Sequence, residues 1–150
     1  MTATIGGQNM VFNCYASLYN NPRTLIIVAS SGSDSYDYQL EFYLLNPPSN
    51  YIGTYKLGYY QNYPTFNPQP KNSCVTYEFG PYWPDGPPNF IAIYDSDSTH
   101  PGVITVTGFN PAYQTISGTF SFIGYQGSSK NLSFPNSINV NNGNFFAQLQ

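Results

Sequence analysis

The residues that could perform acid–base or nucleophilic chemistry are few, and most of them lie in one short run. Asp95, Asp97, Ser98 and His100 all fall within the segment DSDSTH. A Ser-His-acid triad draws its members from separated segments that a scaffold brings together. Neighbours in a polar run instead hydrogen-bond to their own backbone in a turn. We therefore expect a turn here and no catalytic site.

The same run, DSDST, spaces oxygen-bearing side chains in a way that could bind Ca²⁺. It lacks the glycine and the distal bidentate glutamate of an EF-hand loop. We expect no metal site, and calcium binding by this run stays an open alternative.

Paired carboxylates are the other arrangement with catalytic potential. Glycoside hydrolysis needs two carboxyl groups about 5 to 10 Å apart across the sugar. Glu41 and Glu78 are the only glutamates, and both lie in strand-like segments at polar positions. Such positions usually face water, so the sequence predicts no enzyme and no cofactor.

Two cysteines, Cys14 and Cys74, each lie inside a strand-like segment. In an exported protein they would pair and close a loop of about 60 residues, which contributes about 3–4 kcal/mol on a chain-entropy estimate. We predict this disulfide, with two buried free thiols as the alternative. The only histidine, His100, is far from both cysteines in sequence, so no zinc site is expected.

The most unusual feature is the aromatic content of two long loops, Gly58–Asn72 and Gly80–Pro88. Loops of this length without helix or strand pattern usually bind something or cover a sheet edge. Tyr and Trp offer a large rigid contact area with a polar group, which suits sugars and protein surfaces. The alternative is that they pack onto the core as a lid. The predicted ligand-binding residues are Tyr59, Tyr60, Tyr63, Tyr82 and Trp83.

Composition excludes several classes of function. The formal net charge is −3 with only four Lys and Arg, which argues against nucleic acid and against an anionic membrane surface. Charged residues make up 7% of the chain, far below the usual level of about 25%. No apolar run approaches the roughly 20 residues of a transmembrane helix. The start of the chain, MTATIGGQNMVF, lacks a signal-peptide pattern, so we expect any targeting segment to have been removed.

A length of 150 residues predicts a single domain, 1–150. The run from Ile116 to Phe122 alternates apolar or small residues with hydroxyl residues, the pattern of a half-buried strand. Gly6-Gly7 and Asn142-Gly143 predict hairpin turns, the second of which divides the last third of the chain into four strands. Helical spacing with caps is missing. We expect an all-β fold of ten or eleven short strands, either an antiparallel β-sandwich or an up-and-down β-barrel.

Three runs in the last third support a family resemblance: ITVT at 104–107, SGTFSF at 117–122 and INVNNGNF at 138–145. They resemble the ending of an uncharacterised all-β domain family of exported Bacteroidota lipoproteins, and the opening TATIGGQNMVF is also similar. The resemblance covers about the last 45 residues closely and the whole chain loosely. It implies export, a lipidated N-terminal cysteine as the anchor and no established activity. This chain departs from the pattern because it has no cysteine at its start.

Two functional hypotheses follow. The first is a non-catalytic, exported or cell-surface β module that binds a glycan or a protein partner through the two aromatic loops. The second is a structural subunit of an extracellular assembly, a filament or surface layer, in which self-association uses strand edges.

Overall fold

The computed structural model describes residues 1–20, 23–32, 36–58, 73–81, 92–96, 99–100, 102–126 and 131–150. These residues form eleven strands and no helix, which confirms the predicted all-β class. The strands are β1 Thr2–Ile5, β2 Gln8–Val11, β3 Asn13–Asn20, β4 Arg23–Gly32, β5 Tyr36–Leu45, β6 Gly53–Leu57, β7 Cys74–Pro81, β8 Ala92–Asp95, β9 Gly102–Asn110, β10 Thr115–Gln126 and β11 Ser137–Leu149.

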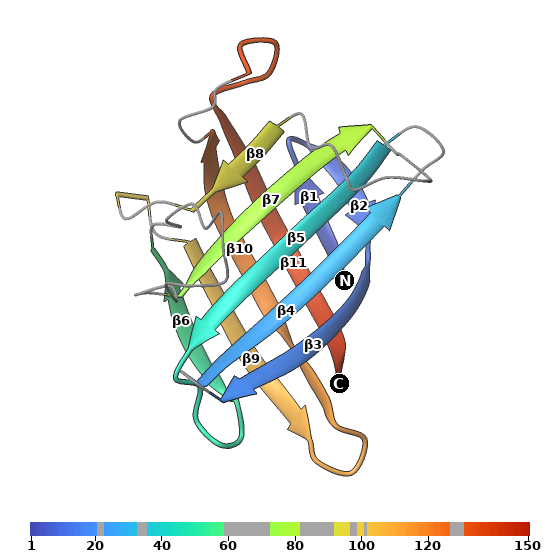
Figure 1. The fold of residues 1–150 in the computed structure, drawn as a ribbon, viewed down its shortest axis with the longest axis vertical. Coiled ribbons are helices and arrows are strands. Elements are labelled where there is room, and N and C mark those ends of the chain that lie inside the picture. The colour runs from blue at the N-terminus through green and yellow to red at the C-terminus, as the bar shows by residue number, and fades with distance from the viewer. Residues whose placement is uncertain are drawn as a thin grey trace.

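All eleven strands belong to one sheet, in the order β2-β1-β11-β3-β4-β5-β7-β8-β10-β9-β6. An additional pairing between β10 and β11 curls the sheet back on itself in a barrel-like closure. Figure 1 shows the result as two layers that face each other, with β3, β4, β5 and β7 in front of β9, β10 and β11. The one parallel pairing among the described strands, β11 with β3, spans two residue pairs at the C-terminus.

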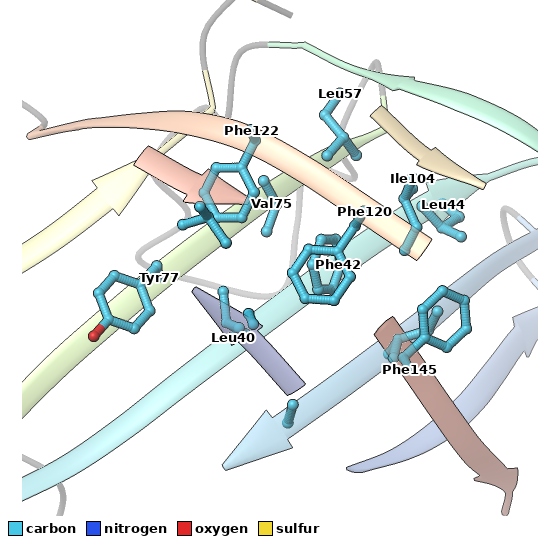
Figure 2. Close-up of a cluster of buried hydrophobic side chains, with 14 of the residues drawn as sticks. Leu40, Phe42, Leu44, Leu57, Val75, Tyr77, Ile104, Phe120, Phe122 and Phe145 are labelled. Carbon is cyan, nitrogen blue, oxygen red and sulfur yellow. The ribbon is translucent and has the colours of Figure 1, made fainter. Parts of the chain in front are cut away.

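The core lies between these two layers, and aromatic rings from both sides meet in it. The ring of Phe42 on β5 lies 4.8 Å from Phe120 and 6.2 Å from Phe122, both on β10, in edge-to-face arrangements that add to area burial. Figure 2 shows these rings among Leu40, Val75 and other buried side chains. The predicted alternation of the SGTFSF strand is confirmed, because its two phenylalanines are buried while its hydroxyl residues face outward.

The hairpin predicted at Gly6-Gly7 is present between β1 and β2. The two glycines have φ of 55° and 86°, and Ile5 pairs directly with Gln8. A two-residue turn of this kind needs positive φ at both central positions, which glycine adopts without steric cost.

The hairpin predicted at Asn142-Gly143 is wrong. The chain does not reverse there, so the last third forms three strands instead of four, and β11 runs unbroken from Ser137 to Leu149. Asn142 adopts the predicted left-handed conformation, with φ of 52°, but as the extra residue of a β-bulge. The register to β10 shifts between the pairs Phe120↔Gly143 and Phe122↔Val140. A Cβ on Gly143 would lie 2.5 Å from the Phe120 ring, so a glycine is needed to let that ring pack against the backbone.

Gln126, at the end of β10, organises the connection to β11 from inside the fold. Its side-chain amide donates to the carbonyl oxygens of Asn131, Phe134 and Pro135, and its Oε1 accepts from the Asn131 backbone N–H at 2.7 Å. The Tyr94 hydroxyl also donates to the Pro135 carbonyl. These bonds satisfy the polar groups of a residue that is only 7% exposed.

The predicted disulfide between Cys14 and Cys74 is not formed, and Cys14 is a free thiol. Cys14 lies on β3 and Cys74 on β7, and β4 and β5 separate these strands. Three strand spacings amount to about 14 Å, whereas bridged Cα atoms lie no more than about 7 Å apart. Burial raises the pKa of the Cys14 thiol to about 11, against a smaller opposing effect of the N-terminal charge.

Candidate functional site

An open trough follows β10 on the outer face of the layer formed by β9, β10 and β11. It consists of two adjoining cavities of about 730 Å³ and 420 Å³ that share Val103, Ser121 and Asn141. We call it the amide trough. Its polar lining consists of Thr105, Thr119, Ser121, Asn139, Asn141, Asn142, Asn144 and, at one end, His100.

Strand alternation and the bulge place these side chains. Thr119 on β10 pairs with Thr105 on one side and with Asn144 on the other, so the three form a row across the sheet. The Thr105 hydroxyl is 3.2 Å from the hydroxyl of Thr54 on β6, which extends the row by a fourth strand. The bulge adds one amide to the part of the trough lining that β11 supplies, because Asn142 is an extra residue and is exposed beside Asn141.

Aromatic side chains lie near both ends of the amide trough. Phe146 is two residues beyond Asn144 on the same face of β11, pairs with Ser117 and is 66% exposed. At the opposite end, the ring of Tyr125 lies 5.0 Å from the His100 ring, with the two rings tilted by 33°. The trough therefore combines uncharged hydrogen-bonding groups with flat apolar surfaces.

A second polar feature lies on the outer face of the opposite layer, across β5, β7 and β8. Thr76 on β7 pairs with Glu41 on β5 and with Asp95 on β8, and Glu78 lies diagonally between these two carboxyl groups. We call Glu41, Glu78 and Asp95 the carboxyl cluster. Both glutamates lie on the outer face, as predicted for polar strand positions, but Glu41 and Glu78 are only partly exposed there. Asp95, predicted in a loop, ends β8 and is only 7% exposed.

Hydrogen bonds are distributed unevenly within the carboxyl cluster. Glu41 accepts two, from the Gln39 amide and from the Tyr43 hydroxyl at 2.5 Å. Glu78 accepts one long bond, 3.5 Å, from the Thr76 hydroxyl. Oδ1 of Asp95 is fully buried and has no hydrogen-bond partner in the described part of the chain. Most donors from the described residues thus serve Glu41, and few of them reach the other two carboxyl groups.

Burial and mutual repulsion change the acidity of two of these groups. Burial raises the pKa of Glu78 from 4.5 to about 7, and the negative charges of Glu41 and Asp95 add to the effect. Burial also raises the pKa of Asp95 from 3.8 to about 6, against an opposing hydrogen bond with Thr76. Both side chains therefore exchange protons near neutral pH.

Within the described ranges, no group of three or more His, Cys, Asp and Glu side chains could hold a metal ion. Asp97 and Ser98 of the calcium alternative lie outside those ranges. The described residues also contain no helix that is long and apolar enough to cross a membrane.

The five predicted ligand-binding residues all lie outside the described residues, so their role stays a prediction: Tyr59, Tyr60, Tyr63, Tyr82 and Trp83. Sequence reasoning missed both the amide trough and the carboxyl cluster. The available signal was the alternation of polar residues in each strand, such as Thr119 and Ser121. The sequence does not show which strands are neighbours in the sheet, and each site is assembled across three of them.

Fold and sites together define an all-β protein with one curled sheet, a shared core and two polar outer faces of different chemistry. The chain belongs to the family described as a domain of unknown function (DUF6252), whose model matches residues 13–148. This confirms the predicted membership of an uncharacterised domain family. No curated protein and no solved structure matches the chain.

Proposed function

We propose that this chain is a non-catalytic, exported or cell-surface β module that binds a glycan in the amide trough. The observation that carries the proposal is the lining of the trough, which presents asparagine amides and serine and threonine hydroxyls from three adjacent strands. Amides and hydroxyls both donate and accept hydrogen bonds, as the hydroxyl groups of a sugar require. Nothing in this lining resembles a catalytic pair of carboxyl groups.

The aromatic residues near the ends of the trough support a sugar over a peptide segment. The apolar face of a sugar ring packs against an aromatic ring, and Phe146 offers an exposed ring on the same face as the amides. On β10 the trough lining runs from Thr119 to Ile123, about 13 Å. The two aromatic residues extend this surface to about 26 Å, from Ser117, opposite Phe146, to Tyr125. A surface of this length favours several consecutive sugar units.

Binding to immobilised glycans, followed by calorimetry on the best ligand, tests the proposal. In the double variant Ser121→Ala, Asn141→Ala we expect affinity to fall by about five-fold to 150-fold, because two hydrogen-bonding groups contribute about 0.5–1.5 kcal/mol each. Phe146→Ala should also weaken binding. Its matched control is Tyr19→Ala, which removes an aromatic ring 50% exposed on β3, in the other layer. Unchanged affinity in the double variant, or an equal loss in the control, would refute the role of the trough.

The two aromatic loops are tested separately with Trp83→Ala combined with Tyr60→Ala. Loss of glycan binding in this variant, with the trough variants unaffected, would place the ligand on the loops as the sequence predicts. Losses in both sets would indicate a ligand that contacts loops and trough together.

Export rests on composition and on the family resemblance. The polar residues of the chain are mainly amides and hydroxyls, with only 7% charged residues. The resembled proteins are Bacteroidota lipoproteins. The free thiol of Cys14 removes the disulfide as support for an oxidising compartment. Fractionation of the native host with an antibody to this domain tests the proposal, and recovery in the cytosolic fraction would contradict it.

A second candidate function is a structural subunit of an extracellular assembly. It is favoured by β2, which ends the sheet and carries no charged residue, while its Gln8, Asn9 and Val11 are exposed. Edge strands usually carry charges or prolines that prevent pairing with another chain. Sedimentation over a range of protein concentrations tests this function, and a monomer at all concentrations would exclude it.

A further inference from the structure

The described residues supply the carboxyl cluster with fewer hydrogen-bond donors than its oxygen atoms can accept. Three carboxyl groups present two acceptor oxygens each, whereas the described residues supply donors only from Gln39, Tyr43 and Thr76. Two of these donors go to Glu41. The single hydroxyl proton of Thr76 serves one acceptor at a time, although Thr76 is hydrogen-bonded to both Glu78 and Asp95.

Asp95 shows this shortage most directly. Its side chain is 93% buried, and Oδ1 has no partner among the described residues. A buried carboxyl oxygen without a donor costs free energy unless a proton or an external group supplies one. Asp95 lies beside Thr76, and its charge raises the pKa of Glu78, so its carboxyl group belongs to the cluster.

We propose that the outer face of β5, β7 and β8 binds an organic cation, a guanidinium or ammonium group carried by a basic side chain, between Glu78 and Asp95. A guanidinium group offers five N–H donors and an ammonium group three, each with the positive charge that paired carboxylates favour. A metal ion fits less well, because the described side chains form no group that could hold one. This site shares no lining residue with the amide trough, although Tyr125, beside His100 at one end of the trough, pairs with Asp95.

The charged and titratable groups around the site leave it without a counter-ion from the described residues. Glu41 and the Tyr43 hydroxyl face it from β5 and Glu78 from β7. From β10, Tyr125 pairs with Asp95 and stacks on His100. The two described basic residues, Arg23 and Lys56, lie on β4 and β6 and do not contribute to the pKa of Glu78 or Asp95. Burial raises both pKa values, as expected for carboxyl groups that hold protons until a cation replaces them.

Calorimetry with two matched probes tests the site: N-acetyl-arginine amide and its uncharged isostere N-acetyl-citrulline amide. We expect only the arginine probe to bind the intact protein, with a Kd on the order of 1 mM. Because protons compete with the cation, its affinity should fall at least tenfold from about pH 8 to about pH 5. In buffers of different ionisation enthalpy near pH 6.5, binding should release protons.

Isosteric variants locate the site. Asp95→Asn and Glu78→Gln should each reduce affinity for the arginine probe at least tenfold, whereas Asp37→Asn, a control on β5 four residues from Glu41, should leave it unchanged. N-acetyl-lysine amide distinguishes a preference for an ammonium group from a preference for a guanidinium group, and binding of either probe supports the proposal.

Equal behaviour of the arginine and citrulline probes, or an equal loss in Asp37→Asn, would overturn the proposal. If a variant does not fold, the probe pair and the pH dependence on the unmodified protein decide the question. Failure of this test leaves the glycan proposal untouched.

Discussion

The two outer faces of the sheet share one core but differ in how their polar groups are satisfied. In the amide trough, exposed neutral side chains such as Thr119 and Asn144 remain available to a ligand. In the carboxyl cluster, Glu78 is partly buried and Asp95 almost fully buried, and the described residues supply them with few donors. Neutral hydrogen-bonding groups can line a surface at little cost, whereas clustered buried acids change their pKa. The first face suits a neutral ligand, and the second suits a proton or a cation.

Both faces depend on the same core, and Phe120→Ala tests this dependence with the largest expected effect. Phe120 is 4% exposed and contacts Phe42 from the opposite layer. Its removal should reduce the free energy of unfolding by about 3–5 kcal/mol. Urea denaturation measures this loss, with Phe146→Ala as the exposed control, expected within about 0.5 kcal/mol of the unmodified protein. Two separate unfolding transitions would contradict a shared core.

The pH dependence of stability should come from the carboxyl cluster. Because the folded pKa values of Glu78 and Asp95, about 7 and about 6, lie above their ordinary values of 4.5 and 3.8, the folded state binds more protons between about pH 4 and pH 7. Stability should therefore be greater at about pH 5 than at about pH 8. After allowance for solvent screening at the partly exposed Glu78, the difference is on the order of 2 kcal/mol.

Urea midpoints at the two pH values measure this effect. The double variant Glu78→Gln, Asp95→Asn should lose most of the difference, while a double variant in the amide trough, Ser121→Ala with Asn141→Ala, should keep it. An unchanged pH dependence in the first variant would show that the cluster is not the cause.

The β-bulge at Asn142 should matter for glycan binding in the amide trough. Asn142 has φ of 52°, a conformation that a β-branched residue adopts only with strain. Asn142→Val should lower the free energy of unfolding by about 1–2 kcal/mol and weaken glycan binding. Asn142→Gly should keep the free energy of unfolding within about 0.5 kcal/mol of the unmodified protein. Thermal unfolding of the two variants measures the difference. Equal stability of the valine and glycine variants would show that the left-handed conformation is not needed.

The smallest expected effect is a difference between the two faces in how ligand affinity depends on salt concentration. Raising sodium chloride from about 0.05 M to about 0.5 M screens exposed and partly exposed charges. Affinity for the arginine probe at the carboxyl cluster should fall several-fold, and glycan affinity at the amide trough should change little. Calorimetry at both salt concentrations checks this, and a strong salt dependence of glycan binding would implicate charges such as Lys56, which lies one strand beyond the trough.

The elements of the fold could be predicted from sequence, because each is determined by local patterns. Alternation in the SGTFSF strand gives the burial of Phe120 and Phe122, and the Gly6-Gly7 pair gives a hairpin. The Asn142-Gly143 pair was misinterpreted for a physical reason. A left-handed asparagine before glycine is compatible with a turn or with a bulge, and the pairing of β11 with strands on both sides selects the bulge.

The sites could not be predicted, because they depend on strand neighbours and register. Glu41 and Glu78 lie 37 positions apart, and only the pairing of β5 with β7 places them diagonally across neighbouring strands. The same applies to Cys14 and Cys74, which the strand order keeps apart. The outer positions of a strand are mostly polar in either case. The sequence therefore does not show whether such a position is exposed, as in the amide trough, or buried, as at Asp95.

Titration of the two glutamates by carbon-13 NMR tests the contrast between the faces most directly. Glu41 and Glu78 are the only glutamates in the chain, so selective labelling of the side-chain carboxyl carbon yields two signals. We expect one signal with a midpoint near pH 7 that disappears in Glu78→Gln. If both signals instead titrate near the ordinary value of 4.5, Glu78 behaves as a solvent-facing residue and the two faces do not differ as we infer.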